Sequence, residues 1–143
     1  MIYLNGKSEF KFEWKGDEVE GVMNRISHTR LDDLGHLLVR EIREAISQLG
    51  TGRKYIRKGK VHIASAPGKP PVIWYGGLHG SIFFMEAVRG NIFFMHVGTG
   101  GEIGEYGKCL EFGTENMAAR PWLGVTLERS RAMIKKFLEE EWF

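Results

Sequence analysis

Residues 81–99 read SIFFMEAVRGNIFFMHVGT, which is two runs of apolar and aromatic residues joined by the dipeptide Gly-Asn. Two β-prone runs on either side of such a two-residue connection are typical of a β-hairpin. With this turn, Val88 lies opposite Phe93 and Phe84 lies opposite Val97. Both faces of the hairpin are largely apolar, so we expect a long helix to cover one face and other structure to cover part of the second.

A further strand is predicted near the N-terminus. In SEFKFEWK, residues 8–15, aromatic and charged residues alternate strictly, which is the pattern of a strand with one buried face. The dipeptide Asn5-Gly6 just before it can turn a short hairpin with Ile2–Leu4. The sequence therefore predicts an antiparallel sheet assembled from local hairpins.

The segment between these strands predicts one long helix. A capping box at Asp17 and Glu20 opens it, and it runs to about Leu49, where Gly50 stops it. Its apolar residues recur mostly every three or four positions and form one stripe. They are Val19, Val22, Met23, Ile26, Leu34, Leu38, Ile42, Ala45, Ile46 and Leu49. The other face is charged and is expected to stay in water. It carries Glu20, Arg30, Asp33, Arg40, Arg43 and Glu44.

The C-terminal part predicts a glycine-rich mobile turn over residues 98–107 and a second helix that Pro121 opens as its first residue. The apolar side of that helix comprises Leu123, Leu127, Ile134, Phe137 and Leu138. The expected fold class is therefore α+β: an antiparallel β-sheet packed by one long N-terminal helix, with a C-terminal helix and a long basic loop.

Residues 51–80 form that loop, and we expect it to be flexible. The segment has no acidic residue, three of the four prolines and little apolar periodicity. Its basic residues are Arg53, Lys54, Arg57, Lys58, Lys60 and Lys69. A connection of this length is either a solvated linker or a functional segment that contacts nucleic acid or an acidic protein surface.

The composition fits a single domain over residues 1–143, with 43% hydrophobic residues and a net charge of only +2. The single cysteine, Cys109, allows no intramolecular disulfide, and the N-terminus lacks the pattern of a signal peptide. No stretch is apolar enough to span a membrane. We therefore expect a protein made in a reducing cytosol, with no membrane partner.

The motifs argue against catalysis. GTGGEIGEYGK, residues 98–108, invites a phosphate-loop interpretation, but that pattern requires glycine at 102 and serine or threonine at 109, where the chain has Glu102 and Cys109. The five histidines are not spaced as metal ligands. The sequence predicts neither an enzyme nor a cofactor or metal site.

Two stretches resemble a known family. Residues 105–128, EYGKCLEFGTENMAARPWLGVTLE, and residues 65–82, SAPGKPPVIWYGGLHGSI, look like the signatures of tail-completion (head–tail joining) proteins of long-tailed bacteriophages and prophages. The first stretch matches at Tyr106, Glu111, Phe112, Gly113, Thr114, Ala119, Arg120, Pro121, Trp122 and Leu123. The second matches at Pro67, Gly68, Pro70, Pro71, Gly77, Leu78, Ser81 and Ile82. The chain departs from the pattern at His79, where the family has arginine, and at Gly107 and Lys108.

The resemblance implies a virion structural protein, a minor tail component of the neck without a cofactor. Copies would form a six-fold ring that completes the tail and joins it to the head connector, so the partners would be the chain itself, the tail-tube protein and connector proteins. The implied subunit or partner interface comprises Tyr106, Glu111, Phe112, Arg120 and Trp122. The basic loop would touch DNA in the channel or dock on the connector.

Two alternatives remain at this point. The corner at Arg120 and Pro121 has either a purely structural role or a subunit contact, and its guanidinium can pair with Glu111 or Glu115. The whole chain is alternatively a small nucleic-acid-binding module that uses residues 53–60.

Overall fold

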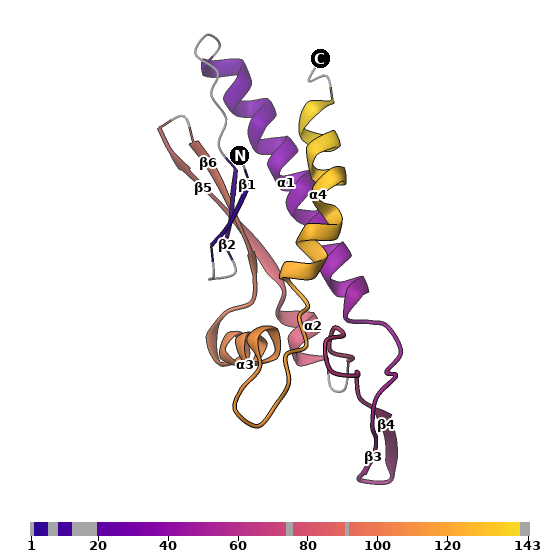
Figure 1. Cartoon of the computed structure of the whole chain (residues 1–143). Helices are drawn as coiled ribbons and strands as arrows, with labels where there is room; N and C mark the ends of the chain where they lie inside the picture. Colours follow the sequence, from indigo (N-terminus) through magenta and orange to yellow (C-terminus); the bar gives the residue numbers. More distant parts are fainter. Residues whose placement is uncertain (1, 6–8, 13–19, 74–75, 91, 141–143) are drawn as a thin grey trace.

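The computed structural model describes residues 2–5, 9–12, 20–73, 76–90 and 92–140, and it has an α+β fold (Figure 1). The elements are β1 (Ile2–Asn5), β2 (Glu9–Phe12), α1 (Glu20–Ala45), β3 (Lys54–Arg57), β4 (Lys60–Ile63), α2 (Gly77–Ser81), β5 (Phe83–Arg89), β6 (Ile92–Gly98), α3 (Gly101–Phe112) and α4 (Gly124–Glu139). Four strands form an antiparallel sheet in the order β1-β2-β6-β5, and β3 and β4 form a separate two-stranded sheet.

The predicted hairpins of the main sheet are confirmed. β5 pairs with β6 in the expected register, with Phe84 opposite Val97 and Val88 opposite Phe93. β1 pairs with β2 as expected, while the predicted turn at Gly6 and the strand residues 13–15 lie outside the described residues.

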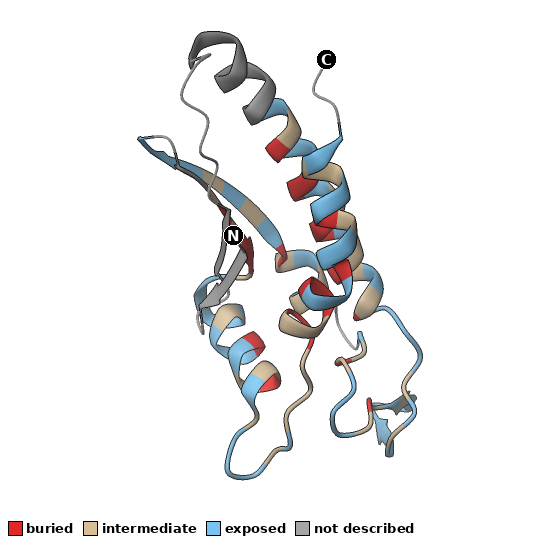
Figure 2. Ribbon diagram, turned by 45° about the horizontal axis from the view of Figure 1, so that its top comes forward, coloured by how far each residue is buried: buried red, intermediate tan, exposed pale blue. Residues whose placement is uncertain are grey.

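The core lies between this sheet and the helices. α1 packs against β5 and β6, and α4 lies along α1 (Figures 1 and 2). The buried apolar residues are Leu31, Leu34, Leu38, Val39, Ile42, Ile46, Ile82, Met95, Val97, Leu110, Trp122, Leu123, Leu127 and Ile134. The two helices and the sheet thus share one hydrophobic core, to which both predicted apolar stripes contribute.

Gly35 explains how β5 approaches α1 so closely. A Cβ atom at this position would lie 2.3 Å from Cδ2 of Phe84, which is far below van der Waals contact. The absence of a side chain lets the Phe84 ring pack against the helix backbone, and the ring also meets His36 edge to face at a centroid distance of 5.0 Å. The cost of glycine in a helix is offset here by packing.

α1 ends at Ala45, four residues before the predicted end at Leu49, which is 92% exposed. The reason is local, because side chains just beyond the helix bind its last carbonyl groups. The Ser47 hydroxyl donates to the Arg43 carbonyl at 2.6 Å, and the Gln48 amide donates to the Glu44 carbonyl at 3.1 Å. The predicted cap at Asp17 lies outside the described residues.

Arg43 corrects the prediction that the charged face of α1 stays in water. Its guanidinium is partly buried and donates from Nε to the His79 carbonyl and from an Nη atom to the Ile82 carbonyl, both at 3.1 Å. These bonds satisfy carbonyl groups at the end of α2 and the start of β5. They hold α2 against α1, and α2 contributes residues to the site described below.

The predicted turn over residues 98–107 is wrong, because α3 begins at Gly101. Gly107 is buried in this helix, and a Cβ there would lie 3.0 Å from Thr99, 3.1 Å from the Trp122 ring and 3.3 Å from Leu78. The glycine therefore makes room for side chains from three other segments. Tertiary packing outweighs its low helix propensity.

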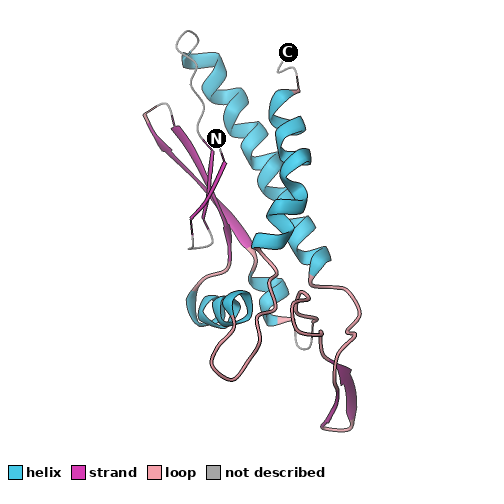
Figure 3. Cartoon of the chain, viewed as in Figure 1, coloured by secondary structure: helices cyan, strands magenta, loops and turns pink. Residues whose placement is uncertain are grey.

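The long loop predicted between residues 51 and 80 contains regular structure. β3 and β4 form a hairpin through Lys58 and Gly59, whose φ angles of 50° and 72° are both positive (Figure 3). Two adjacent residues with positive φ are typical of the tightest hairpin turns. α2 follows at Gly77–Ser81.

Candidate assembly interface

The strongest family-like motif forms a tight corner between α3 and α4, and Glu111 holds it together. Its carboxylate accepts three backbone hydrogen bonds, from the N–H groups of Trp122, Leu123 and Gly124, at 2.8, 2.9 and 2.9 Å. These N–H groups lie at the start of α4, where a helix has donors without partners of their own. The position before α4, Leu123, has no side-chain acceptor, so a carboxylate from the preceding helix serves as the cap.

This cap corrects the predicted start of the last helix. α4 begins at Gly124 rather than at Pro121, and the residues between them turn the chain toward the Glu111 carboxylate. The Thr126 hydroxyl then donates to the Trp122 carbonyl at 2.7 Å, which fixes the first turn.

Trp122 fills the inside of the corner. Its side chain is 2% exposed, and its indole N–H donates to the Gly107 carbonyl at 2.9 Å. A buried indole requires such a partner. The ring therefore locks α3 to the start of α4 both by packing and by a hydrogen bond.

Arg120 joins the corner to the preceding loop. Its backbone N–H donates to the Leu110 carbonyl at 2.7 Å, and its Nε donates weakly to the Ser65 carbonyl at 3.4 Å. The ion pair proposed with Glu111 or Glu115 is not formed among the described residues, because both carboxylate oxygens of Glu111 accept backbone N–H groups instead.

The five predicted interface residues thus fall into two groups. Glu111, Arg120 and Trp122 bind other parts of the same chain, whereas Tyr106 and Phe112 are 56% and 60% exposed on α3. Glu111, Arg120 and Trp122 therefore have a structural role within a single copy of the chain. Of the five, Tyr106 and Phe112 are the most accessible to a partner.

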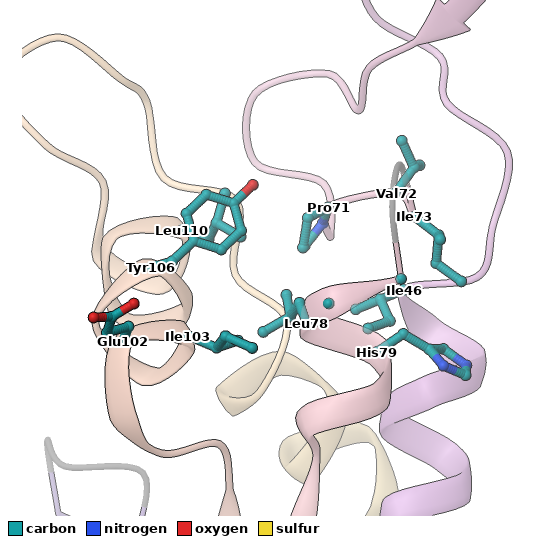
Figure 4. Close-up of a pocket in the computed structure, with 12 residues that line it drawn as sticks. Ile46, Pro71, Val72, Ile73, Leu78, His79, Glu102, Ile103, Tyr106 and Leu110 are labelled. Atoms are coloured by element: carbon teal, nitrogen blue, oxygen red, sulfur yellow. The ribbon is translucent and has the colours of Figure 1, made fainter.

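A largely apolar cavity of about 330 Å³ lies beside α3 (Figure 4). Ile103 and Tyr106 line it from α3, and Leu78 lines it from α2. The remaining lining residues are Ile46, Pro71, Val72, Ile73, Gly76, Gly77, His79, Glu102 and Leu110. The lining is mostly apolar, with Glu102, His79 and the Tyr106 hydroxyl as its polar side chains, and this composition suits another hydrophobic side chain.

The basic residues are not all brought together. Arg53, Lys54, Arg57, Lys58 and Lys60 are exposed on and beside the β3–β4 hairpin, which projects from the rest of the chain (Figure 1). Lys69 instead lines a different cavity, together with Glu41 and Glu44 of α1. Five of the six predicted contacts therefore share one projecting element.

The hairpin has two unlike faces. Residues opposite one another in an antiparallel pair point to the same side, and successive residues alternate. The pairs Ile56–Val61 and Lys54–Ile63 therefore form one face, and Tyr55–His62 and Arg57–Lys60 form the other. The first face carries three exposed β-branched aliphatic side chains, and Ile56 is 73% exposed.

Sequence reasoning missed this apolar face. The signal was present, since Lys58-Gly59 lies between two alternating runs that end at Ile63. The high positive charge of the segment obscured it. Ile103 was missed for a different reason, because residues 98–107 were assigned to a turn.

Among the described residues, no set of three or more histidine, cysteine or acidic side chains is arranged to hold a metal ion. None of the described helices combines the length and apolarity that a membrane crossing requires. Comparisons with protein-family models, with curated proteins and with solved structures find no match to this chain.

Proposed function

We propose that this chain is a virion structural protein of a long-tailed bacteriophage or prophage. Copies of it would form a ring, six-fold by resemblance, that completes the tail and joins it to the head connector. The proposal rests first on the motif from Tyr106 to Leu123. It carries with it the partners that the resemblance implies, which are the chain itself, the tail-tube protein and connector proteins.

The observation that carries the proposal is that some residues of the motif hold the chain together while others are exposed. Glu111 and Trp122 make a rigid corner. Tyr106 is exposed at the edge of an apolar cavity, and Phe112 is exposed elsewhere on α3. Exposed apolar groups next to a hydrophobic hollow are typical of surfaces that bind other proteins.

The direct test is to delete the gene from the phage or prophage genome that encodes it and to image the particles by negative-stain electron microscopy. We expect filled heads and separate tails, with joining restored by the gene in trans. A Tyr106→Asp, Phe112→Asp variant should fail to restore joining while still folding. Normal, infectious particles from the deletion strain would refute the proposal.

One observation favours the alternative of nucleic-acid binding. The cationic face of the hairpin carries Arg57 and Lys60 beside Tyr55. On this view the isolated protein binds DNA, and its affinity falls steeply with salt because bound counterions are released. Fluorescence anisotropy with labelled duplex DNA over a salt series tests it. An affinity too weak to measure at low salt would exclude a free DNA-binding module.

A further inference from the structure

The β3–β4 hairpin cannot be stable through its own contacts alone. Two-stranded hairpins are marginal in water unless further structure covers them. Two backbone hydrogen bonds extend the strand pairing at the base of the hairpin. The Gly52 N–H donates to the Ala64 carbonyl at 2.8 Å, and the Ala64 N–H donates to the Arg53 carbonyl at 2.9 Å. Its aliphatic face, Ile56, Val61 and Ile63, nevertheless remains exposed. This face is therefore accessible to a covering surface from another chain.

The surface around α3 has the complementary properties. It carries exposed apolar side chains, Ile103 and Tyr106, at the edge of the 330 Å³ cavity. It is also acidic where the hairpin is basic. Residues 101–115 expose Glu102, Glu105 and Glu115 against a single lysine, Lys108, whereas residues 53–60 contain five basic residues and no acidic one. Complementary charge around an apolar centre is the usual composition of a specific protein contact.

The hairpin and α3 lie at the same end of the molecule, and Ile103 and Tyr106 point from α3 toward Leu78 and Pro71 across the cavity (Figure 4). The hairpin projects on one side, and α3 lies on the other, in both Figure 1 and Figure 2. A contact between two different surfaces of identical chains is heterologous, and it closes into a ring when the rotation between neighbours allows it.

We propose that the aliphatic face of the β3–β4 hairpin of one copy docks on the α3 surface of a second copy, head to tail. Ile56 and Val61 cover Ile103 and Tyr106 and enter the apolar cavity, while Lys54, on the same face of the hairpin, lies beside Glu102 and Glu105. This inference rests on the proposed function and deepens it, because it names the contact by which the ring closes. The cationic face of the hairpin stays free for a further partner.

The contact is weak in isolation. One face of a two-stranded hairpin buries less than the roughly 800 Å² per partner that is typical of stable complexes. A closed ring doubles the contacts of each copy, and a template such as a tail end raises their effective concentration. We therefore expect purified protein to be monomeric or weakly associated and to need a capture method.

Disulfide capture provides the test, in a Cys109→Ser background that removes the native thiol. Ile56→Cys protein is mixed with Tyr106→Cys protein at about 1 mM, a concentration that populates contacts of millimolar Kd, and is then oxidised. We expect a mixed dimer from this pair and a ladder of oligomers from the double variant. Ile56→Cys mixed with Lys135→Cys is the matched control, because Lys135 is exposed on α4, away from the proposed surface.

Charge reversal adds a second measurement. Lys54 is the basic residue on the aliphatic face, so Lys54→Glu in the hairpin copy should lower the capture yield severalfold, and Glu102→Lys, Glu105→Lys in the α3 copy should restore it. Three outcomes would overturn the inference: no mixed dimer, a mixed dimer no faster than the Lys135 control, or capture of Ile56→Cys only with itself. If gene deletion gives unjoined particles and capture fails, this contact is rejected and the proposed function stands. If capture succeeds and the deletion strain makes normal particles, the contact stands and the proposed function is rejected.

Discussion

Removing the Glu111 carboxylate should destabilise the whole fold. Glu111→Ala leaves the N–H groups of Trp122, Leu123 and Gly124 without their acceptor at the start of α4. A hydrogen bond to a charged group contributes about 1.5–3 kcal/mol net, and loss of a helix cap costs about 0.5–2 kcal/mol. The three bonds share one carboxylate in a partly exposed site, where water can replace part of them. We therefore expect a loss of about 2–3 kcal/mol rather than the sum of three bonds.

Two further substitutions locate the cause. Glu111→Gln keeps one oxygen but turns an NH₂ group toward a backbone N–H, so we expect about half of the loss, roughly 1–1.5 kcal/mol. Glu115→Ala removes an exposed carboxylate four residues away and should change stability by less than about 0.5 kcal/mol.

The assay is urea unfolding followed by circular dichroism, together with a thermal melt. For a chain of this size, a loss of 2–3 kcal/mol corresponds to a fall in Tm of about 5–10 °C. The reasoning would be refuted by a Glu111→Ala protein that unfolds like Glu115→Ala. It would equally fail if Glu111→Gln proved as stable as wild type, because a second acceptor oxygen would then not be needed.

The remaining predictions concern the same corner and the hairpin. Trp122→Ala should lower the free energy of unfolding by about 3–5 kcal/mol in urea unfolding. Trp122→Phe should lower it by about 1–2 kcal/mol, because phenylalanine loses the bond to the Gly107 carbonyl but keeps most of the packing. Near-equal stability of Trp122→Ala and wild type would refute burial. Gly107→Ala should destabilise the fold by about 1–3 kcal/mol despite alanine's better helix propensity. Gly80→Ala is the control and should be neutral or stabilising, because a Cβ there meets nothing within 4 Å. The reverse order of melting temperatures would contradict the crowding argument. Replacing Lys54, Arg57, Lys58 and Lys60 by alanine should leave the Tm of the free domain nearly unchanged and reduce infectious particle yield. Residues 51–72 should show fast amide hydrogen exchange in the free protein and slow exchange in the assembled particle; equal protection in both states would make this segment an ordinary connector.

The register of the main hairpin could be predicted because its determinants are local. The tight turn and the period-two pattern specify that Phe84 opposes Val97 without reference to the rest of the chain. The same is true of the apolar stripe of α1, of which Leu34, Leu38 and Ile42 are fully buried. These elements are consistent at the local and the global level.

α3 could not be predicted from local signals. Its interior contains glycine at 104 and 107, and each glycine inside a helix costs about 1 kcal/mol relative to alanine. The compensation comes from Trp122, fifteen residues later, whose ring and indole N–H use the space at Gly107. The cap by Glu111 is hidden for the same reason, since its three partners lie on another helix. By contrast, the β3–β4 hairpin had a local signal at Lys58-Gly59, which was outweighed by the charge of the segment.

The corner and the hairpin differ in how firmly they are held, and the proposed assembly would use this difference. The corner is fixed by Trp122 and by three bonds to Glu111, so α3 presents Tyr106 in a preformed orientation. The hairpin is a two-stranded sheet apart from the main one, and in the proposed contact the partner would supply much of its stability. In that proposal, a rigid receptor and a weakly stabilised arm on one chain would keep free copies apart and favour association on a template. Substitutions at Glu111 should therefore lower folding stability, whereas substitutions at Ile56 or Tyr106 should lower assembly and leave the fold intact.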